Sequence, residues 1–261
     1  MLHSKNGRAS LLILLTQAAT FGAPAPQQPA APAAPASPTA PTSPTPTTKS
    51  SPAPASAPSN SPANAAKPTG PGAIIASTGV TERAKKVGDT APDFTLPDAQ
   101  GGNFSLKDAL KKGPVVLTWF RGEWCPFCNK QLTGLQDRLG EFDAAGATVV
   151  AISPQTMDHT EATVTKDSVK FHMLSDEGFK VGEAYGVKYE LPPAMKEHLK
   201  KYKLDLSKFN GGEGEALPLT ASYVIDPHGV IRYAFIDPDY TKRASPDDLL
   251  AAVKKINQAK K

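Results

Sequence analysis

Residues 115–128 read Val115-Val116-Leu117-Thr118-Trp119-Phe120-Arg121-Gly122-Glu123-Trp124-Cys125-Pro126-Phe127-Cys128, and this stretch decides the fold. Its first six residues are β-branched, aromatic or apolar, which predicts a buried strand. The run ends at Gly122, and apolar residues then return at helical spacing, at Leu132, Leu135, Leu139 and Phe142. The stretch therefore predicts a strand, a short turn and a helix that begins at the Cys-x-x-Cys sequence.

The two cysteines lie at the start of this predicted helix. Pro126 suits the first helical position, because its missing N–H would have no partner there. Cys125 is then the N-cap residue and Cys128 lies one turn further on, so both sulfurs are close to the free amides of the helix N-terminus. Those amides and the helix dipole stabilise an anion, which favours the thiolate, the reactive form of cysteine.

The chain contains only these two cysteines, and three uses of the pair are open: redox chemistry, half of a metal site, or a structural disulfide. A zinc site normally takes four ligands, and the sequence has neither a second Cys-x-x-Cys nor a close histidine pair. A structural disulfide across so short a loop would remove little chain entropy. The strand–turn–Cys-x-x-Cys–helix context therefore favours redox chemistry.

Composition divides the chain of 261 residues into three parts. Of its 26 prolines, 15 lie between Pro24 and Pro71, in a segment made mostly of Pro, Ala, Ser and Thr. Such a segment has too little apolar surface to fold, so residues 24–80 are predicted to be a disordered linker that folding does not require. Residues 81–261 are predicted to form one globular domain. The net charge of +4 and the scattered lysines do not favour a nucleic-acid partner.

Residues 1–23 have the layout of a secretory signal peptide. Lys5 and Arg8 precede the apolar run Leu11-Leu12-Ile13-Leu14-Leu15, and small residues follow up to Ala23. This layout predicts export to a periplasm or to the cell exterior. The run is shorter than the ~20 residues that span a bilayer, so membrane attachment is expected only if the segment stays uncleaved.

Strands alternate with helices through most of the predicted domain. Strands are expected over residues 147–153 and 169–174, with a helix between them over about 156–167. The segment 188–219 interrupts this alternation. A hairpin then follows over 222–236, and a final helix begins after Ser245. The order predicts an α/β protein with a mainly parallel sheet covered by helices.

Four landmarks together resemble the peroxiredoxin-like branch of the alkyl hydroperoxide reductase/thiol-specific antioxidant (AhpC/TSA) family. They are Gly88-Asp89-x-Ala91-Pro92-Asp93-Phe94, Phe120-Arg121-Gly122-x-Trp124-Cys125-Pro126-Phe127-Cys128, the hairpin sequence Tyr-Val-Ile-Asp-Pro-x-Gly-Val-Ile that begins at Tyr223, and the ending from Phe235 through Arg243-Ala244. The likeness covers about residues 86–257. It implies a thioredoxin-like three-layer sandwich, in which a central mixed sheet carries helices on both faces.

The resemblance also implies an activity and a set of site residues. Members of the family reduce hydrogen peroxide or alkyl hydroperoxides with electrons from thiols, usually supplied by a thioredoxin-like protein. Here the thiolate of Cys125 is expected to attack the peroxide, Cys128 to resolve the sulfenic acid, and Arg121 to supply positive charge. The substrate pocket is expected to be lined by Thr118, Trp124, Pro126 and Thr220. Neither a cofactor nor a metal is expected.

The sequence departs from the family pattern at three places. Counted from Cys125, the Pro and Thr of the family motif Pro-x-x-x-Thr-x-x-Cys fall on Thr118 and Gly122. The arginine that the family usually carries near residue 222 is replaced by Thr220-Ala221, which leaves Arg121 as the expected cation.

The alternative is an exported, thioredoxin-like thiol–disulfide oxidoreductase. Enzymes of that kind carry a cis-proline where this chain has Thr220, and this difference favours the peroxidase. A copper-binding module is a third reading, but the spacing of His159, His172 and His228 recommends none of them as a ligand. The sequence leaves open which peroxide is reduced, which protein supplies the electrons and how many chains assemble.

Overall fold

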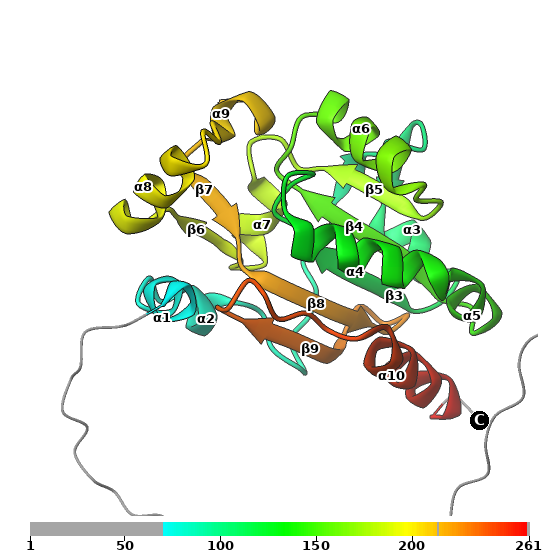
Figure 1. The fold of residues 1–261 in the computed structure, drawn as a ribbon. Coiled ribbons are helices and arrows are strands. Elements are labelled where there is room, and N and C mark those ends of the chain that lie inside the picture. Colours follow the sequence, from blue (N-terminus) through cyan, green and yellow to red (C-terminus); the bar gives the residue numbers. More distant parts are fainter. Residues whose placement is uncertain (1–69, 213, 260–261) are drawn as a thin grey trace, which may run out of the picture. The chain divides into compact units, whose positions relative to one another are not determined.

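A mixed five-stranded sheet forms the centre of the structure, a computed structural model that describes residues 70–212 and 214–259 (Figure 1). The strands lie in the order β5-β4-β3-β8-β9. Neighbours β3, β4 and β5 run parallel, whereas β8 is antiparallel to β3 and β9 is antiparallel to β8. The bounds are β3 (Val115–Trp119), β4 (Thr148–Ser153), β5 (His172–Ser175), β8 (Thr220–Ile225) and β9 (Ile231–Asp237). The prediction of a central mixed sheet is confirmed.

Helices cover both faces of this sheet, which makes the predicted three layers (Figure 1). One face carries α4 (Pro126–Asp137), α5 (Leu139–Ala144), α6 (Met157–Asp167) and α10 (Pro246–Gln258). The other carries α3 (Leu106–Leu110) and α7 (Lys180–Ala184). Among the described residues, no helix is long and apolar enough to span a membrane.

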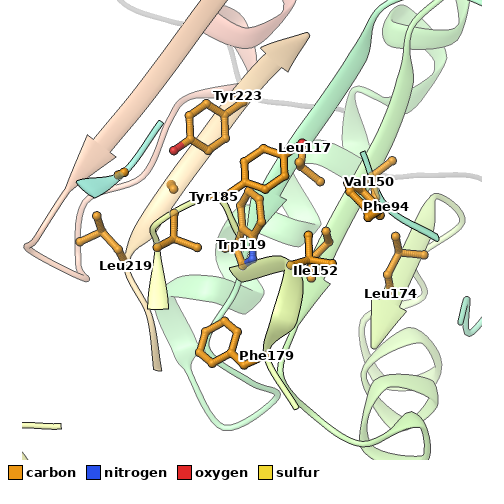
Figure 2. Close-up of a cluster of buried hydrophobic side chains, with 14 of the residues drawn as sticks. Phe94, Leu117, Trp119, Val150, Ile152, Leu174, Phe179, Tyr185, Leu219 and Tyr223 are labelled. Atoms are coloured by element: carbon orange, nitrogen blue, oxygen red, sulfur yellow. The ribbon is translucent and has the colours of Figure 1, made fainter. Parts of the chain in front are cut away.

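The alternation of side chains along β3 builds a separate core on each face. Val116 packs into the core beneath α4 and α10, while Leu117 and Trp119 point into the opposite core. Figure 2 shows this second core, where the rings of Trp119 and Tyr185 lie 4.8 Å apart and Tyr223 packs edge-on at 5.9 Å. Every residue of β3 is buried, which fixes the register of the strand. The position of the loop that carries the cysteines is thereby fixed as well.

Two small antiparallel pairs lie outside the central sheet. The first pairs β1 (Thr95–Pro97) with β2 (Asn103–Ser105). The second, β6 (Lys188–Glu190) with β7 (Ala216–Pro218), encloses α8 (Pro193–Lys201) and α9 (Leu206–Phe209). The segment 188–219 is therefore an insertion whose two ends, β6 and β7, pair with each other, so that the chain leaves it next to the first residue of β8.

The helix that follows the cysteines is shorter than the apolar spacing predicts. It ends at Asp137, and α5 begins two residues later after Arg138, whose backbone leaves the helical region (φ −108°, ψ 7°). Leu132 and Leu135 on α4 and Phe142 on α5 are nevertheless buried in the same core. The periodicity therefore identified the buried face of both helices without showing the break between them.

The folded domain begins earlier than the predicted boundary at residue 81. Two short helices, α1 (Pro71–Ala76) and α2 (Val80–Arg83), lie in and across the last ten residues of the predicted linker. Ile75 and Val80 are only 1% and 0% exposed and belong to the core. The rest of the predicted linker and the predicted signal segment lie outside the described residues. Two isolated apolar positions in a stretch rich in Pro and Ala gave too weak a signal to be recognised as part of the domain.

A tight backbone contact holds this N-terminal segment on the domain. The N–H of Lys85 donates to the carbonyl oxygen of Tyr185 at 3.0 Å. The next residue, Gly186, has a φ of +71°, and a Cβ there would overlap the carbonyl oxygen of Arg83. Glycine is therefore required both by the left-handed backbone and by the close approach of the two segments.

We predict that a chain starting at Gly70 keeps the melting temperature of the full chain, whereas one starting at Thr81 is destabilised. The shorter chain loses the buried side chains of Ile75 and Val80, and emptying a single buried isoleucine site costs ~2–5 kcal/mol. Thermal and urea unfolding of the three chains would measure the difference. Equal stability of the chains that start at residues 70 and 81 would contradict the prediction.

Candidate active site

The cysteine pair lies at the start of α4, after the loop that connects this helix to β3. Cys125 is the N-cap residue, with extended backbone angles (φ −95°, ψ 106°), and Pro126 occupies the first turn, so the predicted helix start is confirmed. The N–H groups of Cys128 and Asn129 each donate to the carbonyl oxygen of Cys125 at 3.1 Å. Both thiols are free, and the two residues are only 1% and 0% exposed.

Arg243, from the segment after β9, supplies the positive charge beside the sulfurs. Its Nη2 lies 3.0 Å from Cys128 Sγ and 3.8 Å from Cys125 Sγ. Its Nη1 donates to the hydroxyl oxygen of Thr220 and, at 3.1 Å, to the carbonyl oxygen of Lys242. Two acceptors thus orient one end of the guanidinium while the other end faces the sulfurs. Thr220, expected to line the substrate pocket, lies next to the site as the acceptor of a hydrogen bond from this arginine.

Arg121, the cation that the sequence predicts, lies beside the cysteines and acts through its backbone amide as well as its charge. Its backbone N–H donates to Cys128 Sγ at 3.4 Å. Its buried guanidinium stacks on two rings, with Cζ 4.3 Å from the ring centre of Tyr240 and 5.0 Å from that of Trp124. Arg121 therefore supports Cys128 through its amide and stacks on its aromatic neighbours. Its charge also lowers the pKa of Cys128, after the larger contribution of Arg243, and opposes the rise in the pKa of Cys125.

The environments of the two thiols drive their pKa values apart. Burial by itself raises the pKa of Cys128, but the hydrogen bond from the Cys125 thiol and the charge of Arg243 outweigh it and lower that pKa to about 6. The pKa of Cys125 is raised, first because it donates this hydrogen bond and then because it is buried. These opposite shifts favour the thiolate on Cys128 and the neutral thiol on Cys125.

This distribution of charge differs from the sequence expectation, which placed the thiolate on the N-cap residue. The free amides of a helix end act on both sulfurs, but Arg243 lies closer to Cys128 than to Cys125, and the Arg121 amide donates to Cys128. In a buried site of low dielectric constant, such a direct charged donor outweighs the more diffuse field of the helix end.

Thr118, predicted to line the pocket, is held inside the sheet. Its Oγ1 lies 2.8 Å from the hydroxyl oxygen of Ser222, which also accepts from Gln131 Nε2 at 3.3 Å. These three buried side chains join β3, β8 and α4 behind the cysteines. Thr118 therefore fixes the base of the site. The other two predicted pocket residues, Trp124 and Pro126, flank Cys125 directly in the chain, and Pro126 is exposed.

The turn between β3 and the cysteines requires glycine. Gly122 has a φ of +148°, and a Cβ there would lie 2.6 Å from Gln155 Oε1 and overlap the indole nitrogen of Trp124. The same Gln155 oxygen accepts from the N–H of Glu123. Gln155, which the sequence did not single out, therefore anchors the loop that leads into Cys125.

The three histidines considered as copper ligands lie in separate contacts. His159 Nδ1 is 3.2 Å from Glu123 Oε1, and His172 Nδ1 is 2.6 Å from Asp98 Oδ2. His228 lies in the turn between β8 and β9, where its N–H donates to Asp226. Within residues 70–212 and 214–259, no three His, Cys, Asp or Glu side chains are grouped as a metal site.

We predict that Arg243→Met raises the pKa of Cys128, because it removes the nearest positive charge. The thiolate is lost as the pH falls through its pKa, so alkylation of the wild type by iodoacetamide should decline only near pH 6. If the substitution moves this midpoint upward by two pH units, alkylation at pH 7 becomes about tenfold slower. Arg243→Lys keeps the charge and should lie between the two. An unchanged midpoint in Arg243→Met would contradict the assigned role.

Comparison with known proteins identifies the family. The sequence model of the AhpC/TSA family matches residues 87–234. The chain is 31% identical to the chloroplastic peroxiredoxin Q of Triticum aestivum over 183 residues, which cover 70% of this chain and 71% of that protein. It is 38% identical to a putative peroxiredoxin of Mycobacterium tuberculosis over 99 residues, which cover 38% of this chain and 62% of that protein.

Solved structures agree with this match. The crystal structure of peroxidoxin BcpB from Mycobacterium tuberculosis superposes with a TM-score of 0.52 at 26% identity, over 66% of this chain and 97% of that one. The reduced 2-Cys peroxiredoxin of Plasmodium vivax shares the fold, with a TM-score of 0.53 over 67% of this chain and 84% of that one. The chain therefore belongs to the AhpC/TSA family, as a peroxiredoxin-like member with a thioredoxin fold.

Proposed function

We propose that Cys128 is the attacking thiolate of this thiol-dependent peroxidase and that Cys125 is its resolving partner. The observation that carries the proposal is the 3.0 Å contact between Arg243 Nη2 and Cys128 Sγ. The lowered pKa of Cys128 and the raised pKa of Cys125 support the same assignment. Counted from Cys128, the proline and threonine positions of the family motif fall on Arg121 and Cys125.

In the first step, the Cys128 thiolate attacks the terminal oxygen of a hydroperoxide. A sulfur–oxygen bond forms, the oxygen–oxygen bond breaks, and the alkoxide or hydroxide that leaves takes up a proton to become an alcohol or water. Arg243 and the Arg121 amide already face this sulfur, so they are placed to stabilise the negative charge as it moves onto the oxygens. The product on the enzyme is a sulfenic acid at Cys128.

In the second step, Cys125 attacks the sulfenic sulfur. A disulfide forms between Cys125 and Cys128, and the hydroxyl group leaves as water. The two residues are one helical turn apart, which is within the reach of a Cys-x-x-Cys disulfide. An external dithiol then returns both thiols by exchange. The family resemblance supports a thioredoxin-like protein as that dithiol, and the signal-like pattern of residues 1–23 supports its action outside the cytoplasm.

The burial of the pair favours a peroxidase over a thiol–disulfide oxidoreductase. A protein disulfide must bring two sulfurs and a stretch of backbone to the attacking thiolate, whereas a hydroperoxide brings one small group. Cys125 and Cys128 are 1% and 0% exposed. Thr220, at the position where a thioredoxin-like reductase has its cis-proline, is bonded to Arg243 instead. The side chains beside the sulfurs are therefore arranged around a small reactant.

We predict opposite behaviour of the two single-cysteine variants. Cys125→Ser should complete one round with hydrogen peroxide and accumulate a sulfenic acid at Cys128, which dimedone traps for mass spectrometry. Cys128→Ser should show no rapid round, because it lacks the thiol that Arg243 contacts at 3.0 Å. A rapid round in Cys128→Ser, with Cys125→Ser inert, would reverse the roles.

The peroxidase activity itself is tested by comparing two substrates. With a dithiol reductant, the wild type should consume hydrogen peroxide repeatedly and reduce insulin disulfides slowly or not at all. Cys128→Ser should stop repeated turnover, because it lacks the thiol that attacks the peroxide. A wild type that reduces insulin quickly and leaves hydrogen peroxide and alkyl hydroperoxides untouched would exclude the peroxidase.

A further inference from the structure

Residues 238–244, here called the strap, connect the end of β9 to the N-cap residue of α10 without regular secondary structure (Figure 1). The strap contacts the active-site loop on both sides of Cys125. Its Tyr240 stacks on the guanidinium of Arg121, before the cysteines, and meets the ring of Phe127, between them. Its Arg243 reaches both sulfurs.

Tyr240 lies at the centre of an aromatic and cationic cluster. Its ring centre is 4.3 Å from Arg121 Cζ and 6.1 Å from the centre of the Phe127 ring, which it meets edge-on. Trp124 contacts the same guanidinium at 5.0 Å. The cluster is partly open to solvent, since Phe127 is exposed and Tyr240 half-buried. It therefore forms part of the solvent-exposed surface around the loop that carries the buried cysteines.

The strap is anchored on both sides of Tyr240. Asp239 accepts from the N–H of Thr241 at 3.0 Å and from the N–H of Lys242 at 3.0 Å, which closes a turn around Tyr240. Helix α1 supports this turn from behind, because a Cβ on Gly72 would lie only 3.2 Å from the Cβ of Asp239. At the other end Ala244 is buried. The backbone on both sides of Tyr240 is thus held, and its side chain is held by ring contacts.

Because both cysteines are at most 1% exposed, a reactant can reach the sulfurs only if some of the side chains around them, here called the cover, move. Hydrogen peroxide is two oxygen atoms long and requires a small displacement, whereas an aryl hydroperoxide brings a ring as large as that of Tyr240 itself. Because the backbone of the strap is anchored, the space for a ring must come from the side chains of the cluster. The cover therefore opposes entry more strongly as the reactant becomes bulkier.

We propose that the ring of Tyr240 limits the size of the molecules that reach Cys128, so that hydrogen peroxide and small alkyl hydroperoxides are admitted and aromatic hydroperoxides are excluded. Tyr240 is then a specificity-determining residue. The selection among hydroperoxides by Tyr240 rests on the proposed function, whereas its limit on the size of molecules that reach Cys128 does not. The two can therefore be tested separately.

The first experiment uses thiol alkylation, which needs no peroxidase activity. N-methylmaleimide and N-phenylmaleimide react by the same chemistry and differ in bulk, and dithiothreitol gives their ratio of rates for an open dithiol. In the wild type we expect the phenyl reagent to be slowed, relative to this reference, by about tenfold or more. Tyr240→Ala should bring the ratio to that of dithiothreitol.

Two further variants separate the ring from other effects. Tyr240→Phe keeps the ring and should keep the wild-type ratio. Tyr202→Ala makes the same truncation at a tyrosine that is 72% exposed and stacks on His198, and it should also keep that ratio. A wild type without discrimination, or a Tyr240→Ala variant with the wild-type ratio, would overturn the proposal.

The second experiment repeats the comparison with hydrogen peroxide and cumene hydroperoxide. The ratio of the two kcat/KM values should fall about tenfold in Tyr240→Ala and stay unchanged in Tyr240→Phe. If Tyr240→Ala turns over both peroxides with the wild-type ratio, Tyr240 does not select the substrate. If no variant consumes either peroxide, the proposed function fails, and the maleimide ratios still decide whether Tyr240 controls access.

Discussion

The contact between Arg243 and Cys128 is the constraint on which the site depends. A buried thiolate without a partner would carry a large desolvation cost, and the arginine at 3.0 Å offsets that cost where the helix end alone would not. The low dielectric constant of a buried site strengthens this attraction. Because the thiolate is the nucleophile, the stability of the charge pair and the reactivity of the enzyme come from one interaction.

The central sheet makes this contact possible between residues 115 positions apart in the chain. Strand β3 leads to the cysteines, and its antiparallel neighbour β8 begins at Thr220, which accepts from Arg243. Strand β9 then returns along β8 and ends where the strap starts. The insertion between β6 and β7 leaves this order of strands intact, because its two ends pair with each other and the chain then enters β8. The start of β8, at Thr220, thus links the central sheet to the active site.

The local features of this site could be predicted from the sequence, and the long-range ones could not. The strand over 115–119, the N-cap position of Cys125 and the first-turn position of Pro126 follow from patterns that adjacent residues carry. The part played by Arg243 depends on a loop folding back from 115 positions away. Its only signal in the sequence was its place in a landmark of the family resemblance, and that landmark assigned it no role. Arg121, closer in sequence, was the expected cation, and its charge does act on both thiols, while Arg243 makes the direct contact with Cys128.

The strap makes reactivity and access depend on the same segment. Arg243 favours the thiolate only because the strap holds it against the sulfurs, and the strap that holds it also brings Tyr240 over Arg121 and Phe127. A more open strap would admit more reactants, but it would hold Arg243 less firmly and let water screen its charge. A tighter one would strengthen the charge pair and close the path to it. In the proposed arrangement the partly exposed aromatic cluster meets both demands, because its rings yield to a reactant while the anchored backbone keeps the guanidinium in place.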